Sequence, residues 1–558
     1  MVTQQNKKWE SVLRLGIGLA VLVVVNLLVN RFLLRLDLTE EKRYTVQPAT
    51  RAILSNLEAQ VYVEVYLEGD FNPEFKRLQK SVEETLQQFQ AYAGSKLIYS
   101  FVKPDVAESA EARKAFYLKL ARLGINPTTV FDDQEGQRVE KLVFPGALVS
   151  YMGKEQGVQL LKGNRSAGSS QVLNQSIEGL EYELATAIRN LSQTERGKVG
   201  IISNHLGLDS LEMMGMVNSL ADRYDVYRAD LNKVADLSVF DALLLIKPTS
   251  AYSEKEKYQL DAYVTQGGKL FVALDQMGVR MEEASEGTVA YTIEHNLDDL
   301  LFRYGVRINQ NLIQDVQCGN FPVVVGDMGD QPQITMLPWP YFPVSAQYGQ
   351  HPIVRNLDAS LLRFVSTIDT VKATGIRKTP LMYSSPYARV LTSPIVISFN
   401  DLRKGLNPEL FNAGIQPVAY LLEGQFISVF KNRMLPEGVN PNTKSQAAGK
   451  VLVVADGDFA RNEVDIKSGK PHPLGFDQFA RQTYANNDFM LNAISYLVEE
   501  EGLITARSKE VKVRPLDKVK VAKDTLFWQL INVALPLLML VLAGILVYFW
   551  RKRKYTSF

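Results

Sequence analysis

Two long apolar runs, one near each end of the chain, constrain its fold more than any other feature. The first extends from Val12 to Leu34 and carries no charge between Leu15 and Asn30. The second, Leu526 to Trp550, is uncharged, has aromatic residues at both ends and is followed by four consecutive cations at 551–554. Each run is long enough to cross a hydrocarbon core of roughly 30 Å, and aromatic and basic flanks are typical of membrane helices. We therefore expect a membrane hairpin of two transmembrane helices with one large body between them.

The short tails of the chain indicate its orientation. Lys7, Lys8 and Arg14 precede the first run, and the cations 551–554 follow the second. Short basic segments stay in the cytoplasm, whereas long domains cross the membrane largely regardless of their charge. We therefore expect a two-pass protein of the inner (cytoplasmic) membrane with a periplasmic body, although cations such as Arg35, Lys42 and Arg43 beyond the first run argue against this orientation. A cleaved signal peptide is the weaker alternative, because bulky residues stand where cleavage requires small ones.

The composition excludes several classes of function. Lys and Arg together number 62 against 61 for Asp and Glu, so no basic excess favours nucleic-acid binding. The single cysteine, Cys318, leaves no disulfide framework, no dithiol redox pair and no thiolate-rich zinc site. The four histidines occur without HExxH or HxH spacing, and the Gly-rich segment 163–171 lacks the Lys-Ser or Lys-Thr ending of a P-loop. We expect no metal, no cofactor and no bound ATP.

Residues 37–196 predict a first α/β domain. Val61, Val63 and Val65 alternate with other residues as in a strand, and apolar positions at three-and-four spacing over 73–92 indicate an amphipathic helix. The further expected elements are strands at 97–102, 128–131 and 143–151 and helices at 112–123 and 177–191. The order strand, helix, strand, helix, two strands, helix is that of a thioredoxin-like domain. Because this domain has no cysteine, we expect a structural or binding role for it.

A second α/β domain is predicted for residues 197–505, after a polar boundary at 192–198. Short apolar strands alternate with helices, and the helix at 253–266 begins with a Ser-x-x-Glu capping box. This alternation argues for a parallel sheet with helices on both faces. The segment of about 276–449 lacks the alternation and is expected to be a large insertion. The expected strands are 199–203, 225–228, 242–247, 269–274 and 450–456, with helices at 211–223 and 487–498.

The other segments complete the expected domain organisation. An N-terminal tail and transmembrane helix occupy residues 1–36, a charged stalk occupies 506–522, and the C-terminal transmembrane helix with its basic tail occupies 523–558. Within the insertion, LPWPYFPV at 337–344 combines three prolines with three aromatic residues. Such a segment is extended and either packs through its rings or docks onto a partner as an arm. We favour packing.

Several segments together resemble a known family. DLTEEKRYT follows the first apolar run, VYVEVYLEGDFNPEFKRL comes next, and LPWPYFPV, HPIVRNLD, STIDTV and VLVVADGDFARN occur later. With these segments, which span nearly the whole chain, the sequence resembles the gliding-motility-associated ABC-transporter proteins of the GldG family. The resemblance implies an accessory or substrate-binding subunit that accompanies a polytopic permease and a separate ATPase. It also implies a class I amidotransferase-like fold for 197–505, of the kind shared with intraflagellar transport proteins.

The resemblance does not imply catalysis. Enzymes of the amidotransferase fold use a nucleophilic cysteine at a strand-to-helix elbow with a histidine partner, whereas here 204–207 follow the first strand and Cys318 lies in the insertion. We therefore expect a non-enzymatic ABC-transporter subunit for gliding motility, with the lipid bilayer, the permease, the ATPase and envelope motility or secretion machinery as partners. The alternatives are an envelope scaffold without a small ligand, and a hydrolase that uses carboxylates such as Asp456 and Asp458.

Four residues are candidates for a ligand site. Asn204 and His205 follow the first strand of the second domain, and Asp456 and Asp458 follow a later one. Ligands of open parallel sheets bind outside the carboxyl ends of the strands, so the four side chains are placed to border one shallow pocket. In the competing interpretation the aspartates accept backbone hydrogen bonds in a turn, and His205 belongs to a surface loop. We assign no catalytic residue and no metal ligand.

Overall fold

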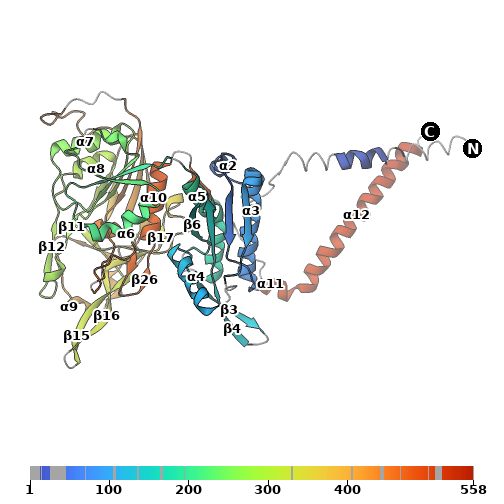
Figure 1. Cartoon of the computed structure of the whole chain (residues 1–558), viewed down its shortest axis with the longest axis horizontal. Coiled ribbons are helices and arrows are strands. Elements are labelled where there is room, and N and C mark those ends of the chain that lie inside the picture. The colour runs from blue at the N-terminus through green and yellow to red at the C-terminus, as the bar shows by residue number, and fades with distance from the viewer. Residues whose placement is uncertain are drawn as a thin grey trace, which may run out of the picture. The chain divides into compact units, whose positions relative to one another are not determined.

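Figure 1 shows the computed structural model of the protein. The structure describes residues 13, 16–24, 45–69, 71–104, 109–134, 137–163, 168–193, 195–234, 236–328, 331–403, 406–439, 445–465, 467–499, 502–508 and 518–556. The chain divides into two compact units, Met1–Glu510 and Val511–Phe558.

The first unit begins with a four-stranded sheet in the order β2-β1-β5-β6. β1 (Val61–Val65) and β2 (Leu97–Phe101) are parallel, whereas β5 (Gly146–Tyr151) pairs antiparallel with both β1 and β6 (Lys154–Gln159). The alternation predicted for β1 is confirmed, because its three valines are buried and its two other residues are exposed. The helices of this part are α2 (Pro48–Ser55), α3 (Pro73–Ala93), α4 (Ala110–Arg122) and α5 (Ser169–Ser192).

The predicted amphipathic helix is also confirmed. In α3 the side chains of Phe75, Leu78, Val82, Leu86 and Phe89 are buried, which is the face that their spacing predicts. The Asn72 side chain caps this helix by accepting a hydrogen bond from the N–H of Phe75 at 3.0 Å.

Two features of this part differ from the expectation. A hairpin of β3 (Thr128–Gln134) and β4 (Gln137–Val143) forms a separate two-stranded sheet before β5. Helix α5 begins at Ser169 rather than at 177, so its first residues belong to the Gly-rich segment 163–171. The start of α5 is mostly polar, with Val172 and Leu173 as its apolar residues over 169–176. Its Ser176 hydroxyl donates to the carbonyl oxygens of Val172 and Lys162, a tertiary contact that sequence periodicity does not report.

A second, eight-stranded sheet has the order β17-β20-β23-β24-β10-β9-β7-β8. Its last five strands are parallel, as predicted: β24 (Ala448–Val454), β10 (Lys269–Ala273), β9 (Ala242–Ile246), β7 (Lys198–Ile202) and β8 (Asp225–Ala229). The helices that follow these strands include α6 (Ser210–Ala221), α7 (Glu254–Thr265) and α10 (Asn486–Val498). The capping box predicted for α7 is present, with Ser253 and Glu256 exchanging hydrogen bonds.

Residues 276–449 contribute three antiparallel strands to this same sheet. β23 (Pro417–Gln425) pairs with β24, β20 (Ile376–Tyr383) pairs with β23, and β17 (Gln347–Tyr348) pairs with β20. The other elements of the segment are β11 (Met277–Gly278), β12 (Thr288–Thr292), α8 (Asp298–Tyr304), β13 (Val306–Ile308), β14 (Asn311–Asp315), β15 (Cys318–Met328), β16 (Gln331–Ser345), β18 (Ser360–Leu361), β19 (Ile368–Thr370), β21 (Ala388–Thr392), β22 (Ile395–Ile397) and α9 (Asn400–Arg403). Two short strands follow β24, β25 (Phe476–Asp477) and β26 (Gln482–Thr483).

The segment LPWPYFPV lies in β16, which pairs with β15 in a long hairpin (Figure 1). Its Trp339 and Tyr341 side chains are 1% and 2% exposed and belong to a small hydrophobic cluster with residues such as Leu312 and Ile397. The packed interpretation of this segment is therefore confirmed.

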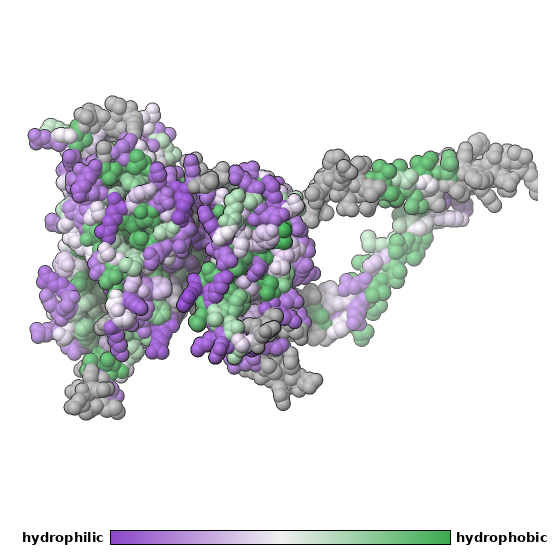
Figure 2. Space-filling model, viewed as in Figure 1, coloured by the Kyte–Doolittle hydropathy of each residue, from purple (hydrophilic) through white to green (hydrophobic). Residues whose placement is uncertain are grey.

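The second unit contains α11 (Lys518–Lys523) and α12 (Thr525–Thr556). Within the described part of the chain, the span Thr525–Arg553 is the helix long and apolar enough to cross a membrane, and its side chains are exposed. Figure 2 shows its apolar surface, and Pro536 lies inside it without ending it. The first apolar run is described only at 13 and 16–24, where it is helical, and the rest of it lies outside the described residues. The two-helix hairpin therefore stays a prediction.

Candidate functional site

The four candidate residues lie at one edge of the eight-stranded sheet, where its parallel strands end. Asn204 and His205 follow β7, and Asp456 and Asp458 follow β24. The strands between them end in charged residues as well, because Lys247 follows β9 and Asp275 lies just beyond β10. The carboxyl ends of parallel strands share one edge, which brings these side chains into the same region.

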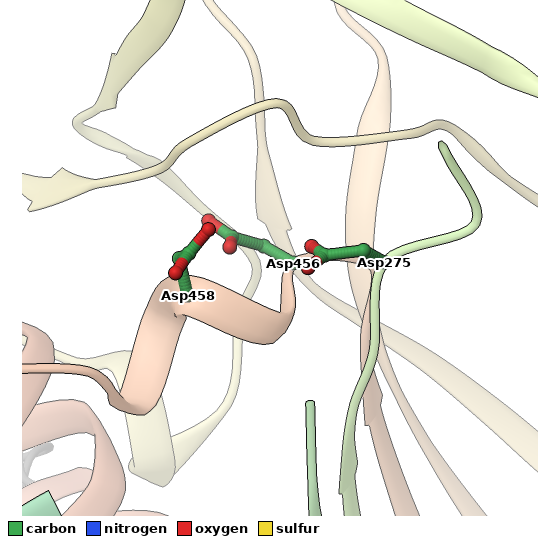
Figure 3. Close-up of side chains that lie close together, drawn as sticks. All are labelled: Asp275, Asp456 and Asp458. Carbon is green, nitrogen blue, oxygen red and sulfur yellow. The ribbon is translucent and has the colours of Figure 1, made fainter. Parts of the chain in front are cut away.

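Three aspartates and one lysine form a compact group, the aspartate–lysine cluster (Asp275, Asp456, Asp458 and Lys247). Lys247 Nζ lies 3.2 Å from Asp275 Oδ2 and 2.6 Å from Asp458 Oδ2. Arg461, one turn beyond, donates from Nη1 to Asp458 Oδ1 at 2.9 Å. The three carboxyl groups come from two segments that meet at this point (Figure 3). Lys247 therefore bridges two carboxylates that would otherwise repel each other.

The backbone around Gly457 closes the cluster. The N–H of Gly457 donates to Asp275 Oδ1 at 2.6 Å. A Cβ at this position would lie 2.7 Å from Asp275 Oδ2 and 2.9 Å from Lys247 Cγ, so a glycine is required for the close approach. The Asp456 side chain is fully buried, and its Oδ2 accepts a hydrogen bond from the N–H of Arg363 at 2.7 Å. Its Oδ1 is buried without a hydrogen-bond partner among the described residues.

The carboxyl groups of the cluster differ in pKa. Burial, together with the charges of Asp275 and Asp458, raises the pKa of Asp456 well above its usual value. Burial also raises the pKa of Asp275 to about 6, although Lys247 opposes the shift. Burial alone would raise the pKa of Asp458 too, but Arg461 and Lys247 lower it on balance. Within the cluster a proton is therefore held more readily by Asp456 than by Asp458.

This charge arrangement bears on metal binding. One oxygen from each of the three aspartates lies within 4.8 Å of the others, which is close enough to share a divalent cation. The Lys247 ammonium already contacts two of them, and a cation would have to compete with it. The side chains of Asp456 and Asp458 are also nearly closed to solvent. Two carboxylates of the cluster are therefore paired with Lys247 and Arg461, and the hydrolase alternative has no accessible pair of carboxylates here.

Asn204 and His205 belong to a different network, centred on Glu256 of α7. Asn204 Nδ2 donates to Glu256 Oε1 at 3.0 Å, and His205 Nε2 lies 3.2 Å from Glu256 Oε2. Burial would raise the pKa of Glu256, but hydrogen bonds from the Ser253 backbone and hydroxyl and from His205 lower it on balance. The network fastens the loop after β7 to the start of α7 and holds His205 at a left-handed φ of 61°.

The second nitrogen of His205 contacts a serine, and this contact has a possible catalytic meaning. His205 Nδ1 lies 2.7 Å from Ser250 Oγ, so a hydroxyl, an imidazole and a carboxylate touch in the order used by serine hydrolases. A nucleophile also needs a cavity beside it to hold substrate. Three cavities of the described residues, near Tyr263, Arg303 and Tyr182, are lined by other side chains. The contacts of His205 with Ser250 and Glu256 join the loop after β7 to the segment around the start of α7.

The lone cysteine has no features of a nucleophile. Cys318 begins β15, and burial together with the charge of Asp315 raises the pKa of its thiol to about 12. Only the thiolate is strongly nucleophilic, and at this pKa it is scarce at neutral pH.

No hydrogen bond or ion pair among the described residues joins the Asn204–His205 pair to the Asp456–Asp458 pair. The expectation that these four residues border one ligand pocket therefore stays a prediction. The sequence did not lead us to predict three further residues of these networks, which are Lys247, Asp275 and Glu256. The signal for the first two was present, because each is a charged residue that follows an apolar strand, as Asp456 does.

The raised pKa of Asp456 leads to a pH-dependent prediction. Asp456→Asn should flatten the loss of stability between pH 5 and pH 7. The folded protein keeps the proton on Asp456 where the unfolded chain releases it near pH 4, so stability falls as pH rises above that value. The measurement is urea denaturation of the full chain in detergent at both pH values. Asp465→Asn is the control, because the pKa of Asp465 is lowered and it stays ionised throughout this range. An unchanged pH slope in Asp456→Asn would contradict the assignment.

Comparison with known proteins shows which families the chain matches. A family model described as ABC-type uncharacterized transport system matches residues 196–493, and a model for a domain of unknown function matches residues 40–150. An uncharacterized protein of Borreliella burgdorferi (strain B31) is 21% identical over 563 residues, which covers 98% of this chain and 99% of that protein.

Similarity to solved structures is low. The N-terminal domain of mmIFT52 is 12% identical with a TM-score of 0.31, covering 54% of this chain and 97% of that one. A ThuA-like protein from Parabacteroides merdae is 12% identical with a TM-score of 0.28, covering 58% and 94%. These scores support no conclusion about fold or function. The first family model, by contrast, covers more than half of the 558 residues. The chain therefore belongs to the family described as ABC-type uncharacterized transport system.

Proposed function

We propose that the chain is a non-enzymatic accessory subunit of an ABC transporter that is anchored in the inner membrane, with its body in the periplasm, and serves gliding motility. The family supports the accessory role in an ABC transport system. Membrane anchoring is supported above all by α12, whose apolar side chains are exposed along Thr525–Arg553. An exposed apolar surface of that length is stable in water only if lipid or another protein covers it. The basic tails support the periplasmic placement of the body.

We assign binding or structural roles to the two α/β parts. The strand order β2-β1-β5-β6, with β1 parallel to β2, supports a thioredoxin-like assignment for residues 37–196. The five parallel strands β24-β10-β9-β7-β8 support the amidotransferase-like assignment for 197–505. The first of these parts lacks cysteine, and in the second Lys247 pairs with two of the three clustered aspartates; both observations support a use without catalysis.

The expected partners are a polytopic permease and, through it, a separate ATPase. The chain has no nucleotide-binding motif of its own, so the energy for transport must come from another subunit. Helix α12 is the expected contact, because small residues such as Gly544 leave room for close packing against a neighbouring membrane helix.

A deletion tests this proposal. Full-length chain and a variant lacking residues 524–558 are purified from native membranes in mild detergent, and the co-purified proteins are identified by mass spectrometry. We expect the permease and ATPase with the full-length chain, and at least a severalfold lower recovery with the deletion.

A matched variant separates anchoring from specific packing. It carries an unrelated apolar helix of the same length in place of α12. If this variant recovers the permease as well as the natural chain does, α12 serves only as an anchor. If no ABC permease accompanies the full-length chain, the accessory role is wrong, and the scaffold alternative takes its place.

A further inference from the structure

The largest cavity of the first unit among those considered above lies between its two α/β parts. It has a volume of about 1250 Å³ and is lined by α5 and the end of β6 on one side and by α10 and the 3₁₀ segment Leu503–Ser508 on the other. Polar contacts hold the two sides together, including the ion pair of Arg189 with Glu499 at 2.5 Å and the hydrogen bond from Asn356 Nδ2 to Glu178 Oε2 at 2.9 Å. Cavities at domain junctions are common ligand sites.

Some charged groups in the cavity are already paired. Lys162 Nζ lies 2.9 Å from Glu183 Oε2, so this cation is neutralised. Arg507 donates to Asn492 Oδ1 at 2.8 Å and to the carbonyl oxygen of Arg355 at 2.6 Å, and its guanidinium stacks on the Tyr182 ring. These contacts give the cavity a fixed polar wall.

Other polar groups in the same cavity lack a partner. Arg223 has no side-chain hydrogen bond or ion pair to any other described residue. Tyr182 is 2% exposed, and its hydroxyl has no hydrogen-bond partner in the described part of the chain. The side-chain oxygen of Asn487, which also lines the cavity, is likewise buried without a partner there. Unsatisfied buried polar groups cost free energy, and a ligand that satisfies them recovers it.

We infer that this cavity binds a small hydroxylated anion, such as a sugar acid or a sugar phosphate. The planar guanidinium of Arg223 matches a carboxylate or phosphate group, and the Tyr182 hydroxyl can donate to the same group. The Asn487 side-chain oxygen accepts only, so it selects a ligand that also carries a hydroxyl donor. Arg223 makes no ion pair with another described residue, and the cavity is also lined by the carboxyl groups of Glu74, Asp358 and Asp488, so the site suits a ligand with a single anionic group. It would bind such a ligand whether or not the chain accompanies a transporter.

Titration calorimetry of the full-length chain in detergent tests this site with three probes: glucuronate, glucose 6-phosphate and glucose. We expect millimolar or tighter binding of at least one anionic sugar, and at least about tenfold weaker binding of glucose. A preference between the two anions distinguishes a carboxylate site from a phosphate site. Binding of neither anion at millimolar concentration would overturn the inference.

Variants assign the binding to this cavity. Arg223→Met should weaken binding of the anion by at least about tenfold, and Tyr182→Phe by about threefold to tenfold. Tyr182→Phe removes only an unpartnered hydroxyl and keeps the ring under Arg507, so it is expected to fold even if Arg223→Met does not. Arg228→Met is the control, because Arg228 is exposed and donates to Ser210 outside the cavity. Binding that Tyr182→Phe leaves unchanged would place the anion elsewhere.

Discussion

Lys247→Met is expected to lower the free energy of unfolding by about 3 kcal/mol at pH 7. The Lys247 ammonium contacts Asp275 and Asp458 at 3.2 and 2.6 Å, and the two carboxylates are 7% and 9% exposed. Removing the cation leaves two like charges close together in a poorly solvated place. Removing one partner of a buried ion pair costs far more than the intact pair contributes, because the other charge stays buried.

The effect of Lys247→Met should depend on pH. With a pKa raised to about 6, Asp275 takes up a proton more readily than an ordinary aspartate, and losing the cation raises this pKa further. The folded variant then binds more protons than the unfolded chain above about pH 4, so its stability falls as pH rises. We therefore expect a smaller loss at pH 5 than at pH 7, measured by urea denaturation of the full chain in detergent.

Lys233→Met is the matched control for this change. Lys233 lies 2.9 Å from Asp230, but its side chain is 83% exposed. Exposed ion pairs contribute about 0 to 1 kcal/mol, so this variant should unfold almost as the natural chain does at both pH values. Equal effects of the two lysine variants would show that the aspartate–lysine cluster is not an integral part of the fold.

Trp339→Ala should destabilise the protein by about 3 to 5 kcal/mol. Trp339 is 1% exposed and contacts the rings of Phe321, Tyr341 and Phe399 at centroid distances between 5.3 and 5.8 Å. The cluster around it is small and separate from the main core, so few neighbours can move to fill the cavity. The loss should concentrate in the β15–β16 hairpin, where hydrogen exchange of the backbone would accelerate.

Ile334→Ala on the same strand controls for Trp339→Ala. Ile334 lies in β16 but is 59% exposed, so the substitution should change stability by less than about 1 kcal/mol. If Trp339→Ala is no more destabilising than Ile334→Ala, the hairpin is not held by its aromatic residues. The segment LPWPYFPV would then be free to dock elsewhere.

Features with a local physical cause could be predicted from the sequence. The alternation of Val61, Val63 and Val65 reflects the two-residue period of a strand, and the apolar spacing in α3 reflects the helical period. The capping box of Ser253 and Glu256 depends only on groups within one turn. The apolar length of α12 follows from counting residues. Each of these depends on neighbours in the chain, which the sequence lists directly.

The candidate site was predicted in part for the same reason. Asp456 and Asp458 could be named because they follow an apolar strand, and parallel strands end at one edge. Their chemistry could not be derived, since the charge of Asp456 depends on burial and on Asp275, which is distant in the chain. Only the fold brings Lys247 into contact with the carboxylates of Asp275 and Asp458. The fold also places Asn204 and His205 in a separate network with Glu256.

Outside residues 276–449, the sequence by itself therefore determined the type and approximate limits of most helices and strands, including the five parallel strands and the apolar C-terminal helix. Only the tertiary structure decided that β17, β20 and β23 join the parallel sheet, because pairing at a sheet edge depends on which distant strand is available. It also decided the early start of α5 and the cavity beside Tyr182. Burial, charge pairing and the shape of a cavity each depend on many contacts between distant segments of the chain. A local pattern in the sequence therefore cannot predict them.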